Sequence, residues 1–213
     1  MKALPVQRTS VIEHLQAMPD VFDLGLFLLT TGVSRGSAKV MISRWASKGY
    51  VELAGPKAGL YLKRLGATMD RSQQIEAAVL HLYPSATICG ATILHQAGWT
   101  TQIPRELHVA IEERPSVTQL TGVTLFQRPL SWFRTVHDHK GFDVDDRASL
   151  LSLRMLQPHW ALADMMKHRD GWVPDEDDLD IPDQKAENAV ELAKQALMGP
   201  LPVSKTRARP RMR

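Results

Sequence analysis

A row of basic and hydroxyl side chains recurs at helical spacing between residues 34 and 48. Arg35, Lys39 and Ser43 follow one another at intervals of four, so they share one face of a helix. Guanidinium, ammonium and hydroxyl groups contact the phosphates and base edges of double-stranded DNA. The spacing therefore predicts a DNA-contacting face, and the residues expected to form it, together with one lysine at a nearby hairpin tip, are Ser34, Arg35, Ser37, Lys39, Ser43, Arg44, Lys48 and Lys57.

Two further groups of residues could hold a metal ion. His137 and His139 would point the same way on a strand, but zinc sites need three or four ligands and no third follows at a recognisable spacing. The run PDEDDLDIPD, residues 174–183, offers the carboxylate oxygens that Mg²⁺ prefers. A metal-dependent nuclease is therefore one alternative function. We instead expect a solvated turn at the histidines, a solvated acidic loop, and neither metal nor cofactor.

Two polar residues lie inside apolar runs. Asp164, in the run ALADMM, is expected to form a hydrogen bond or an ion pair with a nearby arginine, and a direct functional role is the open alternative. Cys89 stands between Ile88 and Gly90, where a buried small hydrophobe is the expected role. Gly-rich phosphate loops, Cys-x-x-Cys pairs and Gly-x-Ser-x-Gly elbows do not occur. The sequence therefore does not favour an enzyme.

The basic row requires a scaffold, and periodicity predicts one over residues 1–66. Helices are expected over residues 9–18 and 24–31, and a third begins after Ser34, with Gly32 ending the second in the left-handed conformation. Runs YVELA and LYLKR, joined by GPKAG, predict a hairpin. Three helices and a hairpin form a winged helix-turn-helix. A winged helix that binds protein and leaves its basic face solvated is the alternative. The apolar stripe expected to fix the third helix is Ala38, Met41, Ile42 and Trp45.

The remainder of the chain changes character after residue 66. Residues 67–182 carry helical spacing at 70–83, 150–157 and 159–168, and strand-like runs at 106–111 and 122–128. Between the first helix and these strands, residues 86–99 suggest a short strand followed by a helix of small residues. We therefore expect a mixed α/β domain there. Residues 183–213 are expected to add an amphipathic helix and a disordered basic tail that strengthens DNA binding without reading sequence. The predicted fold class is α+β.

Charge is distributed unevenly along the chain. Residues 1–66 hold nine Lys and Arg against four Asp and Glu, a net charge of +5. Residues 142–191 hold five against thirteen, a net charge of −8, and residues 192–213 hold six basic residues and no acidic one. The total of +3 therefore conceals basic ends around an acidic segment, a pattern that indicates nucleic acid as a partner of the ends.

The order of these motifs resembles the AbiEi-type antitoxins, transcriptional regulators of type IV toxin–antitoxin systems. Residues 32–62 match the family's N-terminal domain, with the Lys48-Gly49 boundary and the Gly59-Leu60-Tyr61 strand in the expected order. The segment CGATILHQAGWTTQIP is similar to the family's Gly-x-Thr-x-Leu-x-x-x-Gly helix. ALADMM and WVPDEDDLDIP resemble the end of its second domain, whereas the helix and tail after Pro182 lie outside the resemblance.

The resemblance implies a repressor of its own promoter whose second domain counters a nucleotidyltransferase-like toxin without forming a stable complex with it. It also places Asp164 at a possible antitoxin-domain site. A regulator whose second domain senses a small ligand is the alternative. The single cysteine and the absence of a signal-peptide pattern favour the cytoplasm, and the longest apolar run, residues 24–33, is too short to cross a membrane.

Overall fold

The computed structural model describes residues 10–114, 116–143 and 153–199, and within these ranges the protein is mixed α and β with two small sheets. This confirms the predicted α+β class. The predicted basic tail and residues 150–152 of a predicted helix lie outside the described residues. We call residues 10–66 the N-terminal unit and residues 67–182 the second unit.

The three predicted helices of the N-terminal unit are present. α1 (Val11–Ala17) has Ser10 as its N-cap, and α2 (Leu24–Thr31) begins at Asp23 and ends at Gly32, whose φ is 67°. α3 (Arg35–Ser47) begins at Ser34. The three helices enclose one hydrophobic core, formed by Leu15, Met18, Phe22, Phe27, Ala38, Ile42, Trp45 and Val51.

A three-stranded antiparallel sheet completes the N-terminal unit. The predicted hairpin is present as β2 (Val51–Leu53) and β3 (Leu60–Lys63), and β1 (Val21–Asp23) pairs with the other edge of β3. β1 was not predicted from the sequence, because a strand of three residues between a proline and a helix is too short to show alternation.

The second unit is built around a four-stranded sheet. Its strands are β4 (Thr87–Ile88), β5 (Leu107–Glu112), β6 (Val123–Arg128) and β7 (Arg154–Met155), in the order β6-β5-β4-β7. β5 and β6 run parallel, as do β4 and β7, and β4 is antiparallel to β5.

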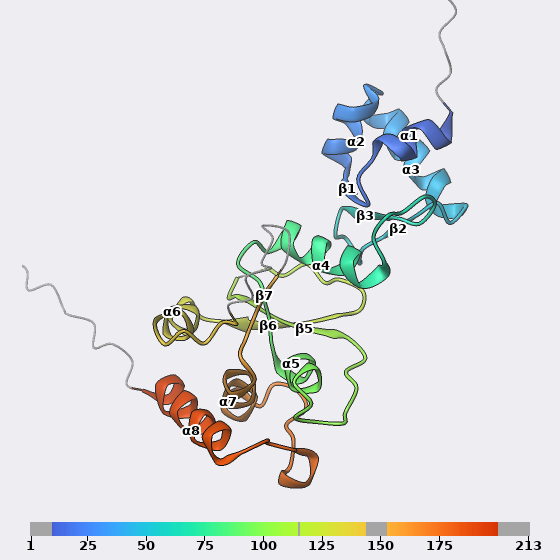
Figure 1. Cartoon of the computed structure of the whole chain (residues 1–213). Helices are drawn as coiled ribbons and strands as arrows, with labels where there is room; N and C mark the ends of the chain where they lie inside the picture. The colour runs from blue at the N-terminus through green and yellow to red at the C-terminus, as the bar shows by residue number, and fades with distance from the viewer. Residues whose placement is uncertain (1–9, 115, 144–152, 200–213) are drawn as a thin grey trace, which may run out of the picture.

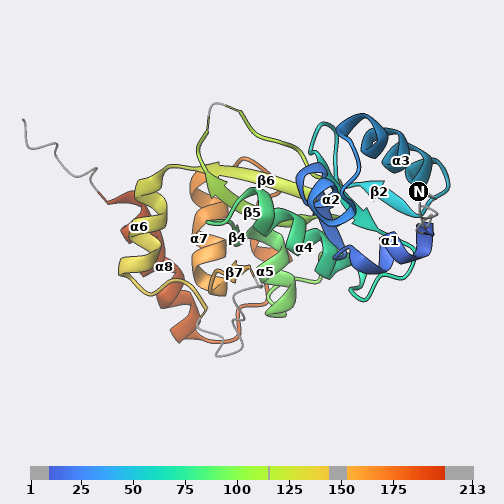
Figure 2. The same ribbon diagram turned by 90° about the horizontal axis from the view of Figure 1, so that it is seen from above.

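Helices cover both faces of this second sheet (Figure 1). α4 (Arg71–Leu82) lies between the two sheets, and α5 (Gly90–Gln96) and α7 (Pro158–His168) lie on the opposite face. α6 (Leu130–Asp138) follows β6, and the predicted C-terminal helix, α8 (Gln184–Met198), packs on α7. Figure 2 shows α3 at one end of the molecule and α6 and α8 at the other.

One prediction for the second unit is wrong, and another is confirmed only in part. Residues 154–155, expected to be helical, form β7, because Arg154 and Met155 pair with β4 and the leucine spacing of a short run fits either structure. Residues 137–139, expected to be a solvated turn, are exposed, but the turn begins only at His139, because His137 lies in the last turn of α6. The buried stripe that makes this segment helical is Trp132, Phe133 and Val136.

β3 belongs to both units. The side chain of Tyr61 packs against the core of the N-terminal unit, whereas Leu60 and Leu62, on the opposite face of the strand, are buried in the core of the second unit. Ala54, just beyond β2, is buried in that second core as well. The two units therefore share a packed interface through β3 and Ala54, whereas residues 64–70, which join them along the chain, are exposed.

A buried ion pair fastens the same boundary. Asp20 and Lys63 approach within 2.9 Å, and their side chains are 2% and 6% exposed. The second carboxylate oxygen of Asp20 accepts hydrogen bonds from the backbone N–H of Thr68, 2.7 Å away, and of Met69, 2.5 Å away. Gln74 of α4 donates to the carbonyl oxygen of Lys63 at 2.7 Å. These contacts join the residue before β1, the end of β3 and the first half of α4.

Candidate nucleic-acid interface

The turn before α3 fixes the direction of this helix. Gly32 ends α2 in the left-handed conformation, and Ser34 accepts a hydrogen bond from the backbone N–H of Ser37 at 3.2 Å. The hydroxyl groups of Ser34 and Ser37 lie 2.9 Å apart. A short turn followed by a satisfied N-cap starts the helix at one defined residue.

One side of α3 is buried and thereby sets the orientation of the other side. Ala38, Ile42 and Trp45 are buried, and the ring of Trp45 meets Phe27 of α2 edge-on, with centroids 5.3 Å apart. The residues selected on α3 from the sequence are all exposed, as is Lys48 at its C-terminal end. We call Arg35, Lys39, Ser43, Arg44 and Lys48 the basic face of α3.

Among the described residues, no carboxylate forms an ion pair with the cations of the basic face. Within residues 10–114, 116–143 and 153–199, the ion pairs involve other residues and none includes Arg35, Lys39 or Arg44. Lys48 lies over the ring of Tyr50, with its Nζ 5.9 Å from the centroid. An exposed helix face that carries several cations is suited to contact phosphates and base edges.

The hairpin tip carries the last predicted DNA contact. Lys57 is exposed and adopts a φ of 58°, which is unusual for a residue with a side chain. Gly55, two residues earlier, is buried. The exposed tip therefore comprises only a few residues beyond a buried base.

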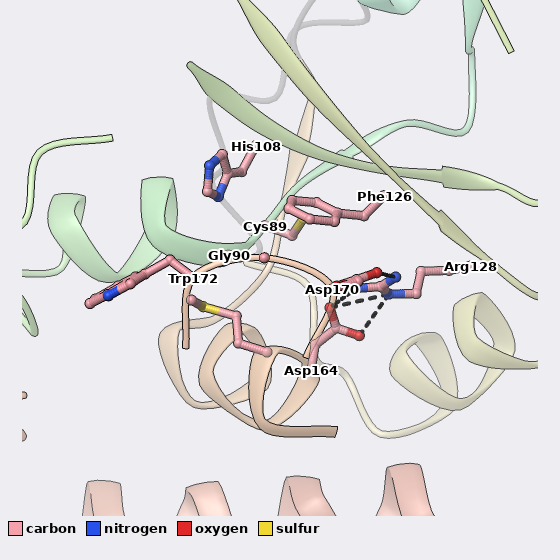
Figure 3. A pocket seen from close by; sticks show the side chains of 10 residues that line it. Cys89, Gly90, His108, Phe126, Arg128, Asp164, Asp170 and Trp172 are labelled. Atoms are coloured by element: carbon pink, nitrogen blue, oxygen red, sulfur yellow. Dashed lines mark hydrogen bonds and ion pairs between the residues drawn. The ribbon is translucent and has the colours of Figure 1, made fainter. Parts of the chain in front are cut away.

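Asp164 lies far from this surface, in a buried polar cluster of the second unit (Figure 3). Arg128, at the end of β6, donates to Asp164 through Nε at 3.0 Å and through Nη2 at 2.8 Å. Trp132 of α6 donates its indole N–H to the same carboxylate at 2.7 Å, and Asp170 accepts from Arg128 Nη1 at 2.5 Å. The expectation that Asp164 pairs with an arginine is confirmed, although the sequence did not single out Arg128, Asp170 or Trp132 as its neighbours.

The interactions within this cluster favour the ionised forms of Arg128 and Asp170. Burial alone would lower the pKa of Arg128, but Asp170 and Asp164 outweigh it and raise that pKa. Burial opposes the shift at Asp170 as well, yet the hydrogen bond from Arg128 lowers its pKa. Burial and the charge of Arg128 lower the pKa of His168, whose Nε2 lies 3.5 Å from Asp164. An ionised Arg128 therefore links β6, α7 and the segment after α7.

A small cavity borders this cluster but leaves no room for a substrate. It measures about 10 Å³, which is space for about one water molecule, and Cys89 and His108 contribute to its lining. Cys89 is fully buried, and burial raises the pKa of its thiol well above the ordinary value. This environment fits the predicted role of Cys89 as a small hydrophobe, because nucleophilic cysteines need a lowered pKa.

Neither of the two candidate metal-binding groups forms a cluster of three ligands among the described residues. His137 and His139 lie at the end of α6, where Nδ1 of His139 is 2.9 Å from the carbonyl oxygen of Thr135. The acidic run contains a short 3₁₀ helix, Glu176–Asp178, capped by Asp175. In the part of the chain that the structure describes, no three His, Cys, Asp or Glu residues are grouped to hold a metal.

Comparison with known proteins does not identify a family. The chain matches no model of a known protein family, and a search of curated proteins also finds no match. None of the helices in the described ranges has the length and apolar character needed to cross a bilayer.

Proposed function

We propose that this protein binds double-stranded DNA through a winged helix-turn-helix formed by the N-terminal unit. The observation that carries the proposal is the basic face of α3, which is exposed, lacks paired carboxylates among the described residues and is held in one orientation by Trp45. In helix-turn-helix proteins the second helix of the motif enters the major groove. The proposal assigns α2, the turn at Gly32 and α3 to this motif, with α3 as the helix that enters the groove.

We further propose that the DNA is the promoter of its own gene and that the protein is an antitoxin. This part rests on the resemblance of residues 20–182 to AbiEi-type regulators, which also supplies the partner, a nucleotidyltransferase-like toxin countered by the second unit. Asp164 is 1% exposed and cannot touch a partner in this conformation. Its proposed part in the antitoxin activity is therefore to hold α7 against β6.

A ligand-responsive regulator is a second candidate, favoured by two neighbouring cavities. One, of about 450 Å³, lies between the start of α7 and α8 and is lined by His159, Trp160 and Leu192. The other, of about 490 Å³, lies between α6 and the ends of α7 and α8. Both volumes are within the range of small-molecule sites. Release from DNA on addition of a cellular small molecule would favour this candidate.

The Lys39→Ala and Arg44→Ala variants test DNA binding by α3. Each is expected to weaken binding to a duplex from the upstream promoter by about 1–3 kcal/mol where the side chain contacts a base. A side chain that contacts only phosphate should instead weaken binding to every duplex uniformly. Titration at fixed salt measures both effects.

A matched control for these variants is Lys185→Ala. Lys185 is an exposed lysine on α8, at the end of the molecule opposite α3, and its removal should leave affinity unchanged. Wild-type affinity in both α3 variants would show that α3 does not contact DNA.

The antitoxin activity is separated from DNA binding by the same full-length variants. Cells that co-express the neighbouring toxin with the Lys39→Ala, Arg44→Ala double variant are expected to grow as they do with the wild-type protein, while a promoter reporter is no longer repressed. Point variants are preferable to truncation at residue 66, because Leu60 and Leu62 are buried in the second core. Loss of protection together with repression would favour a purely transcriptional role.

A further inference from the structure

A loop of the second unit lies directly against the base of the hairpin. In this segment, residues 116–121, which we call the clamp loop, the backbone N–H of Thr121 donates to the carbonyl oxygen of Ala54 at 2.8 Å. Gly55 lies so close to the backbone of Gln119 and Leu120 that a Cβ atom at this position would overlap both. The hairpin base and the clamp loop are therefore in backbone-to-backbone contact.

The clamp loop is itself fastened to α4. The hydroxyl of Tyr83, the C-cap of α4, accepts a hydrogen bond from the backbone N–H of Thr118 at 2.7 Å and donates one to the carbonyl oxygen of Thr118 at 2.8 Å. Tyr83 is 3% exposed, and the guanidinium of Arg114 lies 5.1 Å from its ring centroid. A single buried hydroxyl thus satisfies both backbone groups of one residue and fixes the loop on the core.

These contacts end where the exposed tip of the hairpin begins. Ala54 and Gly55 are buried, whereas Pro56 and Lys57 are exposed. Lys57 adopts a left-handed φ of 58°, a conformation that costs a non-glycine residue about 1 kcal/mol or more and persists where the surroundings impose it. The surroundings on the inner side of the tip include Gly55 and the clamp loop.

We propose that the clamp loop positions Lys57 for contact with a DNA phosphate, with Tyr83 as the positioning residue. This inference rests on the proposed DNA binding, because it assigns a role in that binding to the second unit. Without the Tyr83 hydroxyl, the backbone groups of Thr118 lose their shared partner, the clamp loop gains freedom and the tip no longer holds Lys57 in one place. Affinity then depends on a residue that itself contacts no DNA.

A double-mutant cycle on the full-length protein tests the coupling between Tyr83 and Lys57. Binding is measured over a range of salt concentrations with two probes, a duplex from the upstream promoter and a random-sequence duplex. In the wild-type background, Lys57→Ala is expected to reduce the slope of log affinity against log salt by about 1, the value for one phosphate contact. In the Tyr83→Phe background the same substitution is expected to change the slope much less.

A measurement without DNA tests whether Tyr83 and the clamp loop restrain the hairpin tip. Amide hydrogen exchange of the free Tyr83→Phe protein is expected to increase at residues 54–60 and to stay unchanged in α3. Tyr61→Phe is the matched control, because it removes a hydroxyl from the other face of the same hairpin, where the ring packs on Phe22. This control is expected to change neither the exchange nor the effect of Lys57→Ala.

The outcomes distinguish the inference from the proposed function. Equal slope changes in both backgrounds, no slope change in the wild-type background, or unchanged exchange at residues 54–60 would each overturn the inference and leave DNA binding by α3 intact. A wild-type protein that binds neither duplex would refute the proposed function and, with it, the use of the clamp for DNA.

Discussion

The Arg128→Met variant is expected to lose about 3–5 kcal/mol of unfolding free energy, because the substitution leaves a buried carboxylate without its cation. Arg128 and Asp164 are each 1% exposed, and Asp164 also accepts the indole N–H of Trp132. Methionine approximates the length of the arginine side chain, so the loss reports mainly the missing charge and donors. Urea denaturation followed by tryptophan fluorescence and circular dichroism measures the change.

A matched control and a compensating variant make this prediction specific. Arg134 lies on the exposed side of α6, and Arg134→Met is expected to change the unfolding free energy by less than about 0.5 kcal/mol. Adding Asp164→Asn to Arg128→Met should recover part of the loss, since Asn retains an acceptor for Trp132 and removes the unpaired charge. An Arg128→Met protein as stable as the Arg134→Met protein would show that the buried pair contributes nothing.

The Asp20→Asn variant is expected to lose about 3 kcal/mol of unfolding free energy through the joint between the two units. Its carboxylate meets Lys63 at 2.9 Å and accepts two backbone hydrogen bonds from Thr68 and Met69. Asparagine retains one acceptor oxygen, but it leaves the ammonium group of Lys63, which is 6% exposed, without a counter-charge. Glu13→Gln, in the exposed first turn of α1, is a control with a small expected effect.

The pH dependence of the stability difference between the wild-type protein and Asp20→Asn provides a second test. Burial alone would raise the pKa of Asp20, but hydrogen bonds from Met69, Lys63 and Thr68 lower it from 3.8 to about 2. The folded state therefore holds this proton more weakly than the unfolded state, and the stabilisation is complete above pH 3.8 and disappears as the pH falls through about 2. The linked contribution amounts to about 2 kcal/mol. A stability difference between wild type and Asp20→Asn that stays constant down to pH 2 would contradict this account.

The N-terminal unit could be predicted because its signals are local. Ser34 caps α3, Gly32 ends α2, and the buried stripe through Ile42 and Trp45 recurs at helical spacing. Each of these features depends on residues within a few positions of one another. The same stripe defines the exposed face by elimination, which is why the selected residues of α3 could be placed on the surface from the sequence.

The second unit was harder to predict because distant pairing determines it. β7 exists only through its pairing with β4, about 70 residues earlier in the chain, and two residues are too few to show alternation. α6 begins at Pro129 and buries Trp132, Phe133 and Val136, but a run of nine residues that also contains His137 and Asp138 gives a weak helical pattern.

The contacts that matter most in the second unit carry no sequence signal. An aspartate inside an apolar run predicts an arginine partner, but the sequence contains several arginines, and Arg128 is 36 residues away from Asp164. The sequence predicts Tyr83 only as the end of a helix, whereas its hydroxyl contacts Thr118, 35 residues later in the chain. A single sequence gives spacing along the chain, whereas these side chains are brought together by the packing of β6, α7 and the clamp loop.

The position of β3 in both cores has a consequence for the order of events during translation. Residues 60–63 leave the ribosome before α4 and before β4, β5 and β6, which all contribute residues to the core that includes Leu60 and Leu62. Until those elements are synthesised, one face of the hairpin sheet remains exposed to solvent. The clamp loop has not been synthesised at that stage either. Nascent chains fold from the N-terminus as successive units appear. The helices of the N-terminal unit can therefore form early, but a hairpin tip fixed for DNA is a property of chains whose second unit has already been made.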